Sequence, residues 1–120
     1  MKYLCLIYED ESIWNKRSEE DNGKVFAAYG TYTKDIQTSG HMLGGDALQP
    51  TQTATTVRVR NGKVSTTDGP FAETKEQLGG YYLIEATDLN DAIQVSARIP
   101  GAKTGSIEVR PIMVFSNQPS

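Results

Sequence analysis

The sequence has few of the residues on which site chemistry most often depends. Its 120 residues include one cysteine, Cys5, and one histidine, His41. One cysteine cannot form a disulfide within the chain, which is typical of a reducing compartment and predicts a cytoplasmic protein. A metal site would need more ligands than these two residues, which lie on different predicted elements, so we expect no bound metal.

Long apolar runs and an excess of basic residues are also missing. No run approaches the roughly 20 apolar residues that a membrane-spanning helix needs. The apolar stretch near the start extends only from Tyr3 to Tyr8, and acids follow at once, so it predicts a buried strand rather than a signal peptide. Twelve basic and fifteen acidic residues give a net charge of −3, which argues against nucleic acid as the main partner.

Signatures of cofactor sites are absent too. The sequence has no nucleophile elbow, phosphate loop or dinucleotide fingerprint, so no cofactor is expected. Hydrophobic residues make up 38% of the chain and charged residues 22%, which suits one folded domain. We expect this domain to span residues 1–115, with residues 116–120 ("SNQPS") as a loose tail.

The first half of the chain predicts a strand, a helix and a hairpin. The run "KYLCLIY" is typical of a strand buried on both faces, and "HMLGGDALQP" fits either a short strand or an ordered loop. In "TVRVRNGKV" the turn Asn61-Gly62 predicts a hairpin with Val59 opposite Val64 and one apolar side. A helix capped by Ser18 and ended by Gly40 lies between them. Its inward face is expected to consist of Val25, Tyr29, Tyr32 and Ile36.

The second half predicts a strand, a helix and a strand. "YYLIEA" is a strong strand, and Thr87 or Asp88 can cap the helix that follows it. The last strand is "SIEVRPIMVF", in which Pro111 marks a sheet edge or a bulge. The inward residues of the second helix are expected to be Leu89, Ala92, Ile93 and Ala97.

This order of elements predicts an α+β fold of the ferredoxin-like, split βαβ type. Such a fold has an antiparallel sheet with both helices on one face. The other face is left bare, although the first strand is apolar at every position from Tyr3 to Tyr8. A second copy of the sheet is the economical cover, which predicts a homodimer.

The stretch "TTDGPFAETKEQLGGYYLIEA", residues 66–86, contains most of the candidate site. Asp68 before Gly69 favours a turn in which its carboxylate accepts hydrogen bonds from backbone amides; ligand binding or proton transfer is the alternative. We expect Phe71 to be buried and to fix the loop to the core. Truncation of Phe71 to Ala would then cost on the order of 3–5 kcal/mol.

The segment after the loop predicts one or two helical turns, because "AETKEQ" is rich in helix-forming residues. On such turns Glu73 and Glu76 are neighbours that either hold a cation or, more commonly, form a solvated face. Lys75 is expected to pair with an acid. The glycine pair 79–80 indicates a tertiary contact or a ligand contact.

Three aromatic residues and the histidine complete the candidates. Tyr81 and Tyr82 point to opposite sheet faces, one to the core and one toward a cleft. Trp14 is expected to cover one end of the core, with a binding surface as the alternative. His41 is interpreted as a surface or capping residue, with a general base or pH sensor as the alternative. The candidate ligand-binding cleft comprises Asp68, Phe71, Glu73, Lys75, Tyr81 and His41.

The continuous run from Asp68 to Tyr82 resembles the DGPF family, a branch of the YCII-related proteins, and "KYLCLIYEDE", "LGGDALQP" and "EVRPIM" extend the resemblance over nearly the whole chain. The resemblance implies a dimeric α+β barrel, in which two ferredoxin-like subunits pack sheet against sheet with clefts between helices, sheet and partner. It implies no established reaction. Relatives of this type occur beside or fused to alternative sigma factors, which implies a sensory or regulatory role.

One feature of YCII-type proteins is missing. They carry a histidine early in the first helix and an Asp-Pro before the last strand, a pair proposed to be catalytic. Here the helix begins "SEEDNGKVF", without histidine, and "RIPG" has Ile99 in place of the aspartate.

Three functional hypotheses follow. The leading hypothesis is a small-molecule-binding or regulatory module on a dimeric α+β barrel. The second is a cofactor-independent enzyme that acts on a small organic molecule by proton transfer. The third is a module that binds a partner protein such as a transcription regulator.

Overall fold

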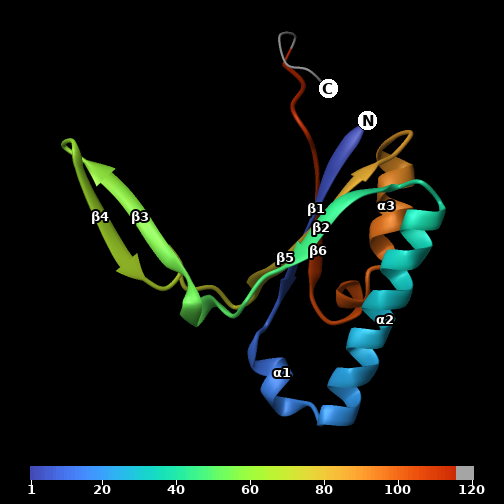
Figure 1. Ribbon diagram of the computed structural model, residues 1–120, viewed down its shortest axis with the longest axis horizontal. Helices are drawn as coiled ribbons and strands as arrows, with labels where there is room; N and C mark the ends of the chain where they lie inside the picture. Colours follow the sequence, from blue (N-terminus) through green and yellow to red (C-terminus); the bar gives the residue numbers. More distant parts are fainter. Residues whose placement is uncertain (116–120) are drawn as a thin grey trace.

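The computed structural model describes residues 1–115, so the tail expected over residues 116–120 lies outside the described part. A four-stranded antiparallel sheet of order β2-β5-β1-β6 forms the centre of the chain, and helices α2 and α3 lie together on one side of it (Figure 1). No helix within the described residues is long and apolar enough to cross a membrane. The elements are β1 (Lys2–Glu9), α1 (Ser12–Lys16), α2 (Glu19–Thr38), β2 (Met42–Ala47), η1 (Thr51–Thr53), β3 (Thr55–Arg60), β4 (Lys63–Asp68), β5 (Gln77–Glu85), α3 (Leu89–Ala97), η2 (Pro100–Lys103) and β6 (Ser106–Pro111).

This topology confirms the ferredoxin-like α+β fold that the sequence predicted. The apolar strand β1 is central, between β5 and β6, as its composition requires. The segment after His41 forms a strand, β2, and pairs with β5 at one edge of the sheet. Pro111 ends β6 at the opposite edge, where a missing N–H is tolerated.

Alternate residues of β1 build the core beneath the helices. Tyr3, Cys5 and Ile7 are buried, and they pack with the fully buried Ile84 of β5 and Ile36 of α2. Side chains on a strand alternate between the two sheet faces, so these three β1 residues all point to the helical side. Burial raises the pKa of the Cys5 thiol, which lies 3.2 Å from the Ser96 hydroxyl.

Among the described residues, no helix covers the opposite side of the sheet. Leu4 and Leu6 of β1 alternate with the core residues, and Leu83 of β5 pairs directly with Leu4. These three leucines, which we call the bare face, are only half-buried. Burial of β1 on both faces is therefore not reached within one chain.

Helix α2 begins and ends where the sequence predicted. The Ser18 hydroxyl accepts a hydrogen bond from the Asp21 backbone N–H at 3.1 Å. Gly40 follows the helix with a φ of +82°, the left-handed conformation in which glycine is favoured. The expected inward residues are buried (Tyr32, Ile36) or half-buried (Val25, Tyr29).

The inward face of α3 was predicted wrongly in part. Asp88 caps the helix as expected, by accepting from the Asp91 backbone N–H at 2.8 Å. Ile99, just beyond the helix, is almost fully buried and anchors the chain, so residues three and four positions before it face the sheet. The helix therefore buries Ala92, Val95 and Ser96, while Leu89, Ile93 and Ala97 are exposed.

Strands β3 and β4 form a separate two-stranded sheet that projects from the body (Figure 1). We call this hairpin, Thr55–Asp68, the arm. The predicted register is confirmed, since Val59 pairs with Val64 around a turn in which Asn61 and Gly62 have positive φ. The projection gives the chain a radius of gyration of 16.5 Å, compared with about 14 Å for a compact chain of this length.

The loop that follows the arm differs from the expectation. Phe71 is 80% exposed rather than buried, because the arm leads its loop away from the core. Within residues 1–115 the Asp68 carboxylate accepts no hydrogen bond, whereas backbone bonds to it were expected. The helical turns predicted for residues 72–77 do not form, since Gln77 pairs with Glu9 as the first residue of β5.

Candidate functional site

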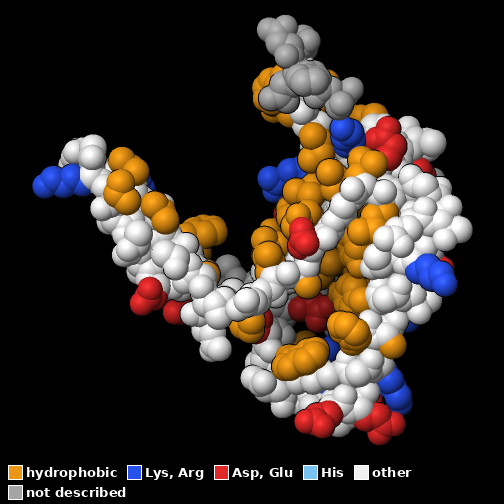
Figure 2. Space-filling model, in the orientation of Figure 1, with side chains coloured by type: hydrophobic (Ala, Val, Ile, Leu, Met, Phe, Trp, Pro, Cys, Tyr) orange, Lys and Arg blue, Asp and Glu red, His pale blue; other side chains and the backbone are white. Residues whose placement is uncertain are grey.

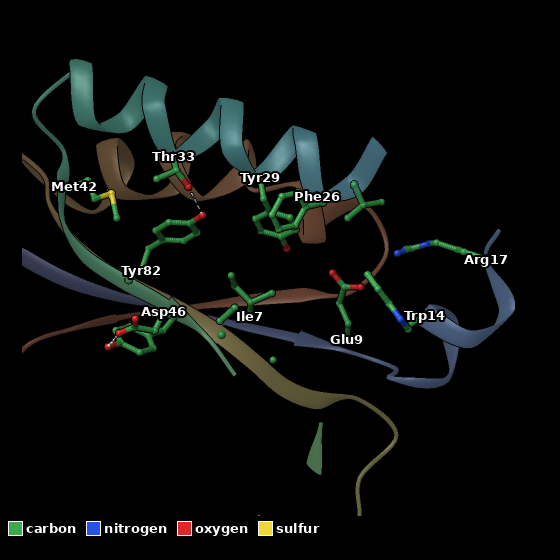
Figure 3. A pocket seen from close by; sticks show the side chains of 16 residues that line it. Ile7, Glu9, Trp14, Arg17, Phe26, Tyr29, Thr33, Met42, Asp46 and Tyr82 are labelled. Carbon is green, nitrogen blue, oxygen red and sulfur yellow. Dashed lines mark hydrogen bonds between the residues drawn. The ribbon is translucent and has the colours of Figure 1, made fainter. Parts of the chain in front are cut away.

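A cleft of about 450 Å³ opens between α2 and the sheet. Its roof comes from α2 and its floor from β1, β5 and the edge strand β2, while α1 and the turn after it border one end (Figure 3). A concave site of this size is large enough for a small organic molecule.

Aromatic and aliphatic side chains form most of the cleft wall. Phe26 and Tyr29 point from α2 toward the sheet, and Trp14 stands at the end bordered by α1 (Figure 3). Ile7 and Met42 contribute from the strands. Trp14 and Phe26 are 57% and 79% exposed, so two large apolar side chains remain in contact with water at the cleft.

The polar groups deep in the cleft are already paired. The hydroxyls of Thr33 and Tyr82 lie 2.7 Å apart (Figure 3). The Tyr29 hydroxyl accepts a hydrogen bond from the backbone N–H of Gly101 at 3.1 Å. The inner part of the cleft is therefore suited to an apolar group, because a buried polar group would lack partners there.

Glu9 and Arg17 place opposite charges at the end of the cleft near α1. Within residues 1–115 neither side chain forms an ion pair. Burial and then the negative charge of Glu9 raise the pKa of Tyr29 to about 12, so the phenol stays neutral. Gly101 leaves room for this contact, since a Cβ there would come 2.5 Å from Glu9 Oε1 and 2.6 Å from the Tyr29 oxygen.

Arg17 also borders a second hollow of about 570 Å³. Glu9 and Val25 are shared between this hollow and the cleft. The second hollow collects more cations than carboxylates, so the surroundings of Arg17 are locally basic. Its charged residues are Glu9, Arg17, Lys24, Asp35, Arg98 and Lys103.

Of the six residues predicted for the site, only Tyr81 borders this cleft. Its hydroxyl donates to Asp46 Oδ2 at 2.8 Å, and this bond raises the pKa of Tyr81. Figure 3 shows Asp46 on the side of the sheet away from α2. Tyr82 is the partner that enters the core, which confirms the predicted alternation.

The other five predicted residues lie elsewhere. Asp68 and Phe71 sit at the base of the arm, and Glu73 and Lys75 are exposed in the loop that leads to β5. Whether they bind a ligand stays a prediction. The structure does not bring any of them to the cleft within one chain.

His41 joins the end of α2 to the start of α3. Its Nδ1 lies 2.7 Å from the Ser39 hydroxyl, and its Nε2 lies 3.2 Å from both carboxylate oxygens of Asp91. The pKa of Asp91 is lowered, chiefly by the hydrogen bond from the Thr87 backbone N–H and further by His41. The imidazole therefore bridges the side chains of Ser39 and Asp91, and its predicted roles stay predictions.

Sequence reasoning did not single out Glu9, Arg17 or Phe26, and it favoured the core rather than a binding surface for Trp14. Spacing offered one signal, because Trp14 and Arg17 are three residues apart and follow the acid that ends β1. That signal was weak, since α1 has only five residues and was not expected.

The described residues contain no group of three or more His, Cys, Asp and Glu side chains arranged to hold a metal ion. The predicted absence of a metal therefore stays a prediction. It can be checked by elemental analysis of the purified protein.

Comparison with known proteins gives two matches. Residues 1–116 match the family model described as the YCII-related domain. The chain is also similar to an uncharacterised protein of Rhizobium meliloti (strain 1021), with 37% identity over 117 residues that cover 96% of this chain and 94% of that protein.

Proposed function

We propose that this chain, which belongs to the YCII-related family, is a small-molecule-binding module. The cleft of this chain is the basis for the proposal. The ligand occupies the cleft between α2 and the sheet. It has an apolar body, which lies against the cleft wall, and an anionic group, which pairs with Arg17.

One observation supports this proposal above the others: an apolar cleft ends at a cation that has no ion-pair partner among residues 1–115. Trp14 and Phe26 supply flat apolar surface, and aromatic rings of this kind contribute large contact areas to ligands. Arg17 can pair with a planar anion through two parallel hydrogen bonds. The neighbouring cations at the second hollow favour the same sign of ligand charge.

Two fluorescent probes test the ligand class directly. 1-Anilinonaphthalene-8-sulfonate has an aromatic body and an anionic group, and N-phenyl-1-naphthylamine has the same body without the charge. We expect the sulfonate to bind one per chain and about tenfold more tightly, which corresponds to about 1.4 kcal/mol. Because Trp14 is the only tryptophan, its emission reports on binding beside it.

Matched variants separate the cleft from the rest of the surface. Arg17→Gln is expected to remove the preference for the sulfonate, whereas Lys34→Gln, on the exposed side of α2, keeps it. Phe26→Ala is expected to weaken both probes, whereas Leu89→Ala, which truncates another exposed apolar side chain on α3, does not. Equal binding of both probes to all four variants would disprove the proposal.

A second function is supported by Glu9, whose carboxylate faces the same cleft beside Tyr29. A carboxylate at an apolar cleft can act as a general base, so cofactor-independent proton transfer is the alternative function. It would appear as deuterium uptake from D₂O by bound carbon acids that Glu9→Gln abolishes. If carbon acids bind but show no such exchange, the proton-transfer function is disproved and the binding function remains.

We also propose that two copies pack through the bare face. Leu4, Leu6 and Leu83 form a contiguous apolar surface that one chain leaves half-buried, and a self-complementary contact of two such faces is the usual symmetric solution. A transcription-regulator partner, implied by the family resemblance, stays a prediction.

A further inference from the structure

Within residues 1–115 the arm has little support from its own chain. Strands β3 and β4 pack substantially only on each other, and neither joins the four-stranded sheet. An isolated two-stranded hairpin is at best marginally stable in water, because it buries too little apolar surface to offset its ordering entropy. A hairpin this well paired, with six residue pairs in register, needs a surface to pack on.

One side of the arm is apolar. Val57, Val59 and Val64 lie on the same side, since Val59 pairs with Val64 and strand residues two apart share a face. They are 61%, 57% and 70% exposed. Figure 2 shows apolar side chains along the arm and over the strands of the sheet, with open space between them. Three clustered valines in water indicate an interface.

The total surface of the chain indicates the size of that interface. The accessible surface is 8692 Å², whereas a compact chain of 13.2 kDa exposes about 6,400 Å². Residues 116–120 account for at most about 800 Å² of this excess. About 1,500 Å² remain, which exceeds the roughly 800 Å² per partner of a standard stable interface.

Charge indicates the chemistry of the partner. The arm has three basic residues, Arg58, Arg60 and Lys63, and one acidic residue, Asp68, so its charge is +2. Because the whole chain carries −3, the rest of the chain carries −5. The arm of one copy and the body of another therefore have opposite charges, which favours their encounter.

We propose that the arm docks on a second copy of this chain, with its valine side against the partner's body, and that two copies exchange arms about a two-fold axis. The same molecule then supplies both surfaces, the apolar arm and the acidic body. This inference stands independently of the ligand proposed for the cleft.

Two hydrogen bonds join the strands of the arm at its base. The Gly69 backbone N–H donates to Ala54 O at 2.7 Å, and the Thr56 hydroxyl donates to Gly69 O at 2.8 Å. Nucleic acid is disfavoured as the occupant, because three cations on a chain of net charge −3 give little phosphate affinity.

Excision of the arm is the first test. Ala54 and Gly69 are hydrogen-bonded neighbours, so an Asn-Gly turn can replace residues 55–68 and close the base. We expect the full chain to be a dimer by light scattering. The dissociation constant of the dimer should be at least a hundredfold higher for the excised chain. Its near-ultraviolet circular dichroism should be retained, because the arm lies outside the core.

The second test keeps the arm and changes its valine side. We replace all three valines with threonine, which keeps the side-chain shape and the strand propensity (Val57→Thr, Val59→Thr, Val64→Thr). The dissociation constant of the dimer should then be at least tenfold higher. The control Ser65→Thr, Thr67→Ser changes the opposite side of the arm and should leave the dimer intact. Amide hydrogen exchange of the arm should be slow only at concentrations where the dimer forms.

Several results would overturn the proposal. They are a monomeric full chain, a dimer unaffected by either arm variant, an arm whose amides are protected in the monomer, or binding of a DNA duplex that requires the arm without dimer formation. Loss of the dimer with retained probe binding at the cleft would separate this inference from the proposed ligand site.

Discussion

At the scale of single residues, two glycines of this chain show that the absence of a side chain is required at one position and only costs stability at another. Gly101 is buried where Glu9 and Tyr29 converge, and an added Cβ would collide with both. Gly23 lies in α2, and an added Cβ there would meet nothing within 4 Å. Gly101 is required because two side chains approach its backbone closely, whereas Gly23 only weakens its helix.

Gly101→Ala is therefore expected to destabilise the chain by about 1–3 kcal/mol, because Glu9 and Tyr29 must move apart. It should also weaken probe binding at the cleft. Gly23→Ala is the matched control and should stabilise the chain by about 0.5–1 kcal/mol. Urea unfolding measures both changes, and equal signs for the two variants would contradict this account.

Phe71→Ala provides a second test at this scale. With its side chain 80% exposed, truncation should change the unfolding free energy of a single chain by less than about 0.5 kcal/mol. The sequence alone predicted a loss several times larger. Chemical denaturation of monomeric protein decides between the two values, and a loss of 3 kcal/mol would show that Phe71 is buried after all.

At the scale of elements, the Asp91 carboxylate links the end of α2 to the start of α3. Asp91 in the first turn of α3 accepts from the Thr87 backbone N–H at 3.0 Å and lies 3.2 Å from His41, which follows α2. This carboxylate therefore holds the start of one helix and the end of the other.

The lowered pKa of Asp91 gives this contact a defined pH dependence. A carboxyl group with a lowered pKa in the folded chain adds stability above its unfolded pKa, about 3.9, and loses it as the pH falls through the folded value. Asp91→Asn should thus destabilise the chain at pH 6, and its difference from the unchanged protein should shrink below about pH 4. Urea unfolding across this range measures it.

The exposed Asp35→Asn on α2 is the control for this experiment. A difference between Asp91→Asn and the unchanged protein that stays constant from pH 6 to pH 3 would show that the carboxylate charge contributes nothing.

At the scale of the whole molecule, the chain is unusually extended for its length. Its extents are 49 × 47 × 18 Å, and residues 1–115 leave both the arm and the bare face without cover. The helical side of the sheet alone carries a complete core. A thin molecule of this shape can bury its exposed apolar surface by association with a second copy.

Leu6→Lys tests the bare face. It places a charge in the centre of the proposed contact, so we expect a monomer by light scattering at micromolar concentration. Ile93→Lys, an exposed apolar residue on α3, should leave the mass of the assembly unchanged. A dimer that tolerates Leu6→Lys would show that the sheets do not face each other.

The sequence by itself determined the features that short-range contacts decide. The Ser18 cap, the end of the first long helix at Gly40 and the turn at Asn61-Gly62 each depend on residues a few positions apart and were predicted correctly, and Asp88 is one of the two caps predicted for α3. Period-two and helical patterns then gave the order of strands and helices. The central position of β1 in the sheet followed from these patterns, because the split βαβ topology places the first strand at the centre.

Only the tertiary structure decided which residues share the cleft and where the arm points. Glu9, Arg17 and Phe26 come from three different segments, and their meeting depends on how α1 and α2 turn against the sheet. The face of α3 was set by the burial of Ile99, and the exposure of Phe71 by the direction of the arm. These features depend on long-range packing, for which local patterns such as the spacing of Trp14 and Arg17 carry only a weak signal.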